Sequence, residues 1–175
     1  MKHLKLSLVI ITIFAIAVSM TSCKFFKEFT VDEMEDLFYE NESVFSNAAT
    51  CLHEIIKDSE LTIRISKTNE YADSSNERMN VRQIKDLYFI TVDYVFTNEE
   101  YKAMYDCVEP LFSSNFVKNR IYGCKSYIKF GINFHNGYDE ALFFTEEDYD
   151  LVSNLYAVED HKHFAPNWHA VVVWF

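Results

Sequence analysis

The chain has 175 residues, of which 49% are hydrophobic and 17% aromatic, and its formal net charge is −11. It contains only three glycines and two prolines, so it is not a collagen-like, low-complexity or disordered protein, because those classes lack the apolar content to bury a core. The acidic balance also excludes a basic nucleic-acid-binding protein, since phosphate would be repelled. The length accommodates one folded domain.

The N-terminal residues have the pattern of a secretory signal. Lys2, His3 and Lys5 form a basic start, and residues 6–20 form a mostly apolar run. As a helix this run would be about 22 Å long, which is shorter than the ~30 Å hydrocarbon core of a bilayer. We therefore expect residues 1–22 to be a cleaved signal peptide that lies outside the folded domain.

The end of this run, Met20-Thr21-Ser22-Cys23, resembles the lipobox of bacterial lipoproteins, in which an aliphatic residue and two small residues precede a cysteine. Met20 stands where leucine is usual. The resemblance implies cleavage before Cys23, a thioether-linked diacylglycerol on its sulfur, and further acylation of its amine. Two or more acyl chains give lasting membrane attachment. Lys24, again by resemblance, argues against inner-membrane retention, so the expected location is the cell envelope, at the outer membrane or cell surface, outside the cytoplasm.

Two alternatives for this segment stay open: an uncleaved membrane anchor, or an ordinary signal in which Cys23 is incidental. Residues 23–29 are expected to form a short membrane-proximal segment without a flexible tether. Phe25 and Phe26 either lie in the membrane interface or pack on the domain. Residues 30–175 are expected to form a single domain.

The domain is predicted to begin with a long amphipathic helix. Thr30 and Glu33 have the spacing of a capping box, and apolar residues then recur at helical spacing to about Lys57. Asn41 is a candidate point of interruption. The acidic residues between 28 and 36 suit the positive end of a helix.

Alternating apolar residues then predict strands at Leu61–Ser66 and Tyr88–Phe96, with residues 67–80 as a loop between them. In the second strand, Tyr88 and Ile90 are expected on the apolar face. A second capping box, Thr97-Asn98-Glu99-Glu100, opens a predicted helix that runs to about Phe112, where Pro110 kinks it or ends it.

The remaining residues predict a hairpin and two terminal strands. Tyr127–Phe134 alternates clearly, and Asn136-Gly137 has the sequence of a tight hairpin turn before Glu140–Thr145. Leu155–Val158 and His169–Phe175 are the last predicted strands, and the final one is apolar on both faces, which places it inside the sheet. The predicted fold is α+β: an antiparallel β-sheet with a long N-terminal amphipathic helix and a second helix packed on one face. In layout alone, this order resembles small uncharacterised bacterial lipoproteins, which implies no activity.

Three cysteines remain beside the lipidated Cys23, and a disulfide is permitted outside the cytoplasm. The preferred pair is Cys107, on the second helix, with Cys124, just before the clearest strand. The alternative, in which all three are small buried thiols, stays open. Cys51 and His53 are two residues apart on a predicted helix and so do not face one another as a nucleophile and base.

One group of metal-type ligands occurs near the C-terminus. Its weak candidates are His161, His163 and His169, and imidazole suits zinc or copper. However, residues 161–167 contain Pro166 and are predicted as a loop, so we interpret these residues as scattered, solvated histidines. We assign no metal and no cofactor.

Four tyrosines outside the predicted core faces are candidates for recognition: Tyr71, Tyr122, Tyr138 and Tyr149.

The chain has no Gly-x-Ser-x-Gly motif and no glycine-rich phosphate loop. We therefore predict a membrane-anchored envelope lipoprotein that is a non-catalytic, acidic protein-binding module for a basic envelope or secreted protein, such as a toxin or an envelope enzyme. The alternative is a lipid-anchored hydrolase or metal-binding protein that uses the C-terminal histidines.

Overall fold

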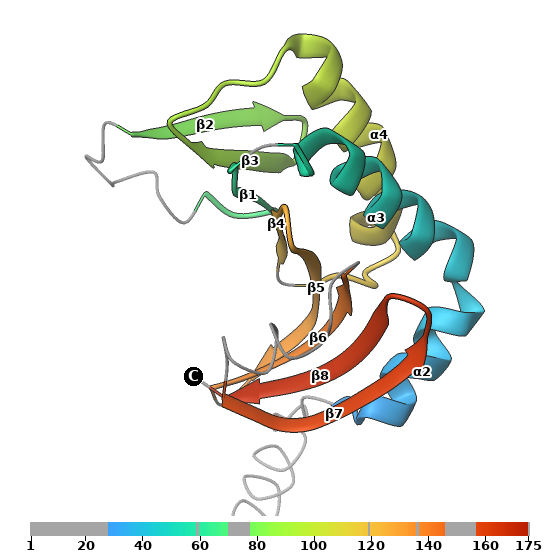
Figure 1. Cartoon of the computed structure of the whole chain (residues 1–175). Helices are drawn as coiled ribbons and strands as arrows, with labels where there is room; N and C mark the ends of the chain where they lie inside the picture. The colour runs from blue at the N-terminus through green and yellow to red at the C-terminus, as the bar shows by residue number, and fades with distance from the viewer. Residues whose placement is uncertain are drawn as a thin grey trace, which may run out of the picture.

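The computed structural model describes residues 28–58, 60–69, 78–118, 120–135, 137–145 and 157–174, and the statements below concern these residues. They form a mixed α+β fold in which helices cover a curved antiparallel sheet (Figure 1). The coarse prediction of an α+β fold with an antiparallel sheet is therefore confirmed. No described helix combines the length and apolar character needed to cross a bilayer.

The helices are α2 (Val31–Glu40), α3 (Glu42–Ile56) and α4 (Asn98–Ser113). The strands are β1 (Ile63–Ser66), β2 (Met79–Ile84), β3 (Leu87–Val92), β4 (Arg120–Cys124), β5 (Tyr127–His135), β6 (Tyr138–Phe144), β7 (Ala157–Ala165) and β8 (Trp168–Trp174). In the sheet they follow the order β2-β3-β1-β4-β5-β6-β8-β7, and every neighbouring pair is antiparallel.

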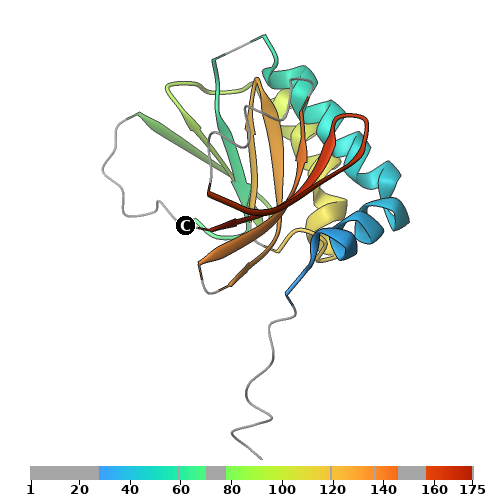
Figure 2. The same ribbon diagram turned by 60° about the horizontal axis from the view of Figure 1, so that its bottom comes forward.

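All three helices lie on one face of the sheet, as the two views show (Figures 1 and 2). An aromatic cluster joins the layers: the ring of Phe38 on α2 lies 4.6 Å from Trp168 on β8, centroid to centroid. Phe45 on α3 lies 5.7 Å from Phe130 on β5, and Phe130 stacks on Trp168 at 5.7 Å. These distances are those of favourable ring pairs, so the cluster adds directional packing to apolar burial.

The long N-terminal helix that we expected is not confirmed, but the break falls at Asn41, the candidate point of interruption. Its capping box is present, because Glu33 N–H donates to the Thr30 hydroxyl oxygen at 3.2 Å and Thr30 N–H donates to the Glu33 carboxylate at 3.1 Å. However, α2 ends at Glu40, and Asn41 has non-helical backbone angles. The Asn41 side chain donates to the carbonyl of Leu37 at 3.0 Å, which satisfies one of the acceptors left open at a helix end. The break lets α2 pack on β7 and β8 while α3 packs on α4, β4 and β5.

The face of the second strand that we expected to be apolar is not the face that the helices cover. Leu87 and Phe89, and not Tyr88 and Ile90, contribute to the core beneath the helices. Phe89 pairs with Ile65, and partners in an antiparallel ladder share a face. Since both faces of β3 carry large apolar residues, alternation alone did not identify the face that the helices cover. The strand also ends at Val92, because Asp93 adopts a positive φ of 56°.

The C-terminal strands differ from the prediction in length. Residues 161–165 belong to β7 and not to a loop, and the turn that follows is made by Pro166 and Asn167, whose φ is 66°. The expected interior position of the last strand is confirmed, because β8 lies between β6 and β7. In the β5–β6 hairpin, Gly137 has a φ of 86°, while Asn136 lies outside the described residues. Strands β2 and β4 were not predicted.

The disulfide joins Cys51 on α3 to Cys107 on α4, with a Cα–Cα distance of 6.6 Å. The expected Cys107–Cys124 pair is therefore wrong, and Cys124 is a free, half-buried thiol. The reason is the layering of the fold. Cys107 packs with the core beneath the helices, whereas Cys124 packs with Tyr127 and Phe143 on the other face, so the sheet separates the two sulfurs.

Removal of this disulfide is expected to lower the free energy of unfolding by about 4 kcal/mol, because the bond closes an interval of 56 residues and restricts the unfolded chain. The comparison is chemical denaturation of a Cys51→Ala/Cys107→Ala variant against the oxidised wild type. A Cys124→Ala variant is the control and should lose less than half as much. Equal losses in the two variants would contradict the assigned pairing.

Candidate functional site

The three C-terminal histidines lie together on the face of β7 and β8 that points away from the helices. Nε2 of His161 is 3.0 Å from Nδ1 of His169, and the rings of His163 and His169 stack with centroids 4.6 Å apart. The interpretation of scattered, solvated histidines is wrong in that the three lie together and His169 is only 5% exposed, whereas His163 is exposed as expected. Burial, followed by the neighbouring charge of His163, lowers the pKa of His161. His169 thus stacks with both His161 and His163. The described residues contain no group of three or more His, Cys, Asp or Glu placed to hold a metal ion.

The same face carries a buried ion pair between β5 and β6. Nζ of Lys129 lies 2.6 Å from the carboxylate of Asp139, and the two residues are 6% and 1% exposed. Burial lowers the pKa of Lys129, while the negative charge of Asp139 opposes this shift. The sequence did not reveal the pair, because an alternating lysine in a strand is typical of a solvent-facing position.

A polar cluster ties the start of the described chain to the β5–β6 hairpin. The buried carboxylate of Glu140 accepts a hydrogen bond from the Asn133 side chain at 3.2 Å and lies 3.3 Å from Nδ1 of His135. Nε2 of His135 is 3.3 Å from the carboxylate of Glu28. These contacts hold the residues nearest to the expected lipidation site against the sheet.

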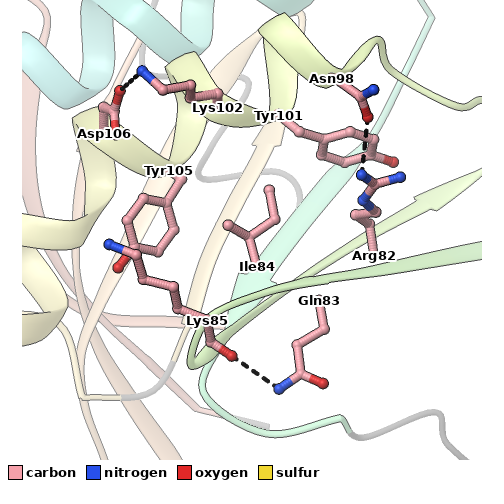
Figure 3. Close-up of a pocket in the computed structure, with 9 residues that line it drawn as sticks. All are labelled: Arg82, Gln83, Ile84, Lys85, Asn98, Tyr101, Lys102, Tyr105 and Asp106. Carbon is pink, nitrogen blue, oxygen red and sulfur yellow. Dashed lines mark hydrogen bonds and ion pairs between the residues drawn. The ribbon is translucent and has the colours of Figure 1, made fainter.

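A cavity of about 460 Å³ lies between the β2–β3 hairpin and α4 (Figure 3). We call it the hairpin pocket; it is lined by Arg82, Gln83, Ile84, Lys85, Asn98, Tyr101, Lys102, Tyr105 and Asp106. Its two tyrosines each lie beneath a cation. The guanidinium of Arg82 is 5.5 Å from the ring centroid of Tyr101, and Nζ of Lys85 is 4.6 Å from that of Tyr105. These are the distances of cation–π contacts.

The hairpin pocket has a local charge opposite to that of the chain. Arg82, Lys85 and Lys102 line it together with one carboxylate, Asp106, which lies 3.0 Å from Lys102. Arg82 also donates to the Asn98 side-chain oxygen at 2.9 Å, which fixes the guanidinium beside the helix. Sequence reasoning missed the pocket because residues 81–87 were assigned to no helix or strand, so the strand that forms one wall was not predicted.

A second surface has a strong negative charge. We call it the acidic helix surface: Asp32, Glu33, Glu35, Asp36 and Glu40 on α2, and Glu42 at the start of α3. The sequence has no lysine or arginine from residue 28 to residue 56. Lys162 on β7 reaches across to Asp32 and Glu35, and these carboxylates raise its pKa. Tyr39 is 51% exposed within this surface.

The remaining predicted site residues are placed as follows. Cys23, Tyr71 and Tyr149 lie outside the described residues. Tyr122 and Tyr138 are half-buried and pack against other rings, Tyr122 with Tyr127 at 5.8 Å and Tyr138 with His135 at 6.0 Å. The exposed tyrosine beside the acidic residues is therefore Tyr39, which sequence reasoning did not single out.

Comparison of the chain with protein-family models, with curated proteins and with solved structures finds no match. The function is therefore inferred from the residues and their geometry.

An Asp139→Asn substitution is expected to lower the free energy of unfolding by about 3–5 kcal/mol at neutral pH, because it leaves the buried Lys129 without its counter-charge. Burial holds the folded-state pKa of Lys129 below 10.5, so the unfolded chain binds more protons in that window. Stability of the variant should therefore rise as pH increases toward 10.5. Urea denaturation at several pH values measures both effects.

The matched control is a Lys129→Met/Asp139→Leu variant, which removes both charges and should recover most of the loss. A cost below about 1 kcal/mol for Asp139→Asn would show that the pair is solvated and would contradict its assignment as buried.

Proposed function

We propose that the protein is a lipid-anchored bacterial envelope lipoprotein whose domain binds a cationic protein without catalysing a reaction. The lipobox-like Met20–Cys23 segment supports the anchor. The observation that carries the binding role is the acidic helix surface, which combines the carboxylates of α2 and of Glu42 with the exposed Tyr39. Such a surface accelerates encounter with a cationic partner, most strongly at low salt.

The proposed lipid would lie close to this surface. Glu28 is five positions after Cys23, so a fully extended connection spans at most about 18 Å. Glu28 is in turn held by His135 on the sheet. The acidic helix surface would therefore face the zone just above the bilayer, where a partner in the envelope would meet it.

Tyr39 supplies the apolar part of the contact. Its hydroxyl donates to the carbonyl of Phe164 on β7 at 2.9 Å, and its ring packs edge-on against Phe38 at 5.6 Å. Because these contacts already fix the side chain, little rotamer freedom would be lost on binding. Rigid, half-exposed tyrosines among polar residues are common binding hot spots.

The second candidate function is that of a lipid-anchored metal-binding protein or hydrolase that uses His161, His163 and His169. The observation in its favour is that the fold brings these three rings together. The stacking of His163 on His169 is against it, since the ring nitrogens of a metal site converge on one point. Zinc analysis of the purified protein separates the two candidates, because stoichiometric zinc that is lost in a His161→Ala/His163→Ala variant would favour the second.

A Cys23→Ala variant is expected to leave the membrane fraction and to lose metabolic labelling by a palmitate analogue, because the acyl chains would have no attachment point. Mass spectrometry of the wild type should show a mature chain that begins at a modified Cys23. A variant that still fractionates with membranes would overturn the lipid anchor and favour an uncleaved apolar segment.

An Asp36→Asn/Glu40→Gln variant is expected to capture its cationic partner from envelope extract about tenfold more weakly, because two exposed charges of the acidic helix surface are removed. The measurement is quantitative mass spectrometry of proteins retained by the full-length chain as salt is raised. The control, Asp58→Asn/Glu99→Gln, removes the same charge at exposed positions outside this surface. If both variants retain the same proteins to the same salt concentration, the acidic helix surface is not the binding site.

A further inference from the structure

No described strand pairs with the outer edge of β2, whereas the opposite edge of the sheet has features that protect it. In the described chain β2 and β7 are the two outermost strands. The β7 edge carries Glu159, Asp160 and Lys162 and is interrupted by two register irregularities, and charges and bulges are devices that prevent strand addition. By contrast, β2 pairs with β3 through an unbroken register from Met79 to Ile84.

The register determines which main-chain groups of β2 point outward. Asp93 N–H donates to the carbonyl of Arg78 at 2.7 Å, so this opposed pair is hydrogen-bonded. Hydrogen-bonded and non-hydrogen-bonded pairs alternate along an antiparallel ladder. Arg82, which opposes Phe89, therefore directs its main-chain groups toward β3, whereas Val81 and Gln83 direct theirs toward the open edge.

The two faces beside this edge have different chemistry. On the helix side, Arg82 borders the hairpin pocket with Lys85 and Lys102. On the other side, Val81 is 41% exposed, and Val92 is exposed to a similar extent. A strand that pairs with β2 would place alternate side chains on these two faces.

We propose that the β2 edge binds an extended segment of a partner protein in which acidic and apolar residues alternate, added as an antiparallel strand. Main-chain hydrogen bonds to Val81 and Gln83 would hold the segment, as in other cases of strand addition. Its acidic side chains would lie beside Arg82 and the pocket lysines, and its apolar side chains would cover Val81. Charge complementarity at the hairpin pocket is what selects an acidic segment over a basic one.

The negative charge of the whole chain does not prevent this binding. The acidic helix surface packs beside β7 and β8, at the far edge of the sheet from β2 (Figure 1). Eight strands at ~4.8 Å spacing place the two edges about 34 Å apart along the sheet, which is several times the ~8 Å screening length at physiological salt. The β2 site is therefore independent of the proposed cationic partner, and either can fail alone.

The test uses full-length protein in detergent and a short capped peptide in which glutamate and valine alternate. In the proposed register the valines oppose Val81 and Gln83, so their N–H groups face β2, whereas those of the glutamates face solvent. N-methylation of the valines should weaken binding at least tenfold, and N-methylation of the glutamates should change it less than threefold. A peptide with lysine in place of glutamate should bind at least tenfold more weakly. Isothermal titration measures all four.

Protein variants test the same geometry from the other side. Val81→Pro removes an outward N–H without breaking the ladder to β3, and it should weaken the glutamate peptide at least tenfold. Val81→Thr keeps that N–H and should cost no more than about threefold. Arg82→Gln/Lys85→Gln should weaken binding and reduce its dependence on salt. Circular dichroism checks that each variant is folded, and the N-methylated peptides need no variant at all.

Three outcomes would overturn the proposal. Absence of binding at millimolar glutamate peptide would exclude the site, and equal binding of the lysine peptide would show that charge does not select the segment. Equal effects of N-methylation at the two sets of positions would exclude strand addition in this register. Light scattering identifies the competing occupant, because a dimer abolished by Val81→Pro would mean that a second copy of this chain covers the β2 edge.

Discussion

The burial of one face of a single antiparallel sheet beneath three helices is the constraint on which the rest of the structure depends. Phe38, Phe45, Phe130 and Trp168 form a continuous set of ring contacts across the two layers. Packing of this density leaves no space for unpaired charge. The carboxylates of the helices consequently lie on the outer sides of α2, α3 and α4, and Lys162 on the edge strand β7 reaches two of them.

The face of the sheet that points away from the helices is packed differently. It has a small apolar cluster around Tyr127, Phe143 and Val171, and several polar side chains buried beside it pair with one another. Lys129 with Asp139 and His161 with His169 are such pairs. Each pair costs desolvation, so burial lowers the pKa of Lys129 and of His161. On this face, replacing both members of a buried pair should therefore cost less stability than replacing one of them.

Prediction from the sequence succeeded for features that depend on residues close together in the chain. It failed for features that depend on which face of the sheet the helices cover. The capping boxes at Thr30 and Thr97 use residues three apart, and both are present. The cysteine pairing depended on the layer in which each sulfur lies, and spacing along the chain carries no such information. The hairpin pocket was missed because β2 is partly polar and follows a polar stretch, so its strand character arises from pairing with β3. The acidic character of α2 was visible, but the exposure of Tyr39 was not.

With the lipid proposed on Cys23, the distribution of charge along the sheet would give the molecule a direction relative to the membrane. Glu28 would then lie within about 18 Å of the attachment point, so α2 and the β7–β8 edge would be close to the bilayer. The β2 edge, about 34 Å farther along the sheet, would project away from the surface. Carboxylates near anionic headgroups repel them and oppose flat adsorption of the domain, since like charges within a screening length still interact. The acidic helix surface would thus do two things at once: keep the domain upright, and hold the open β2 edge with its cationic pocket where a partner outside the membrane can reach it.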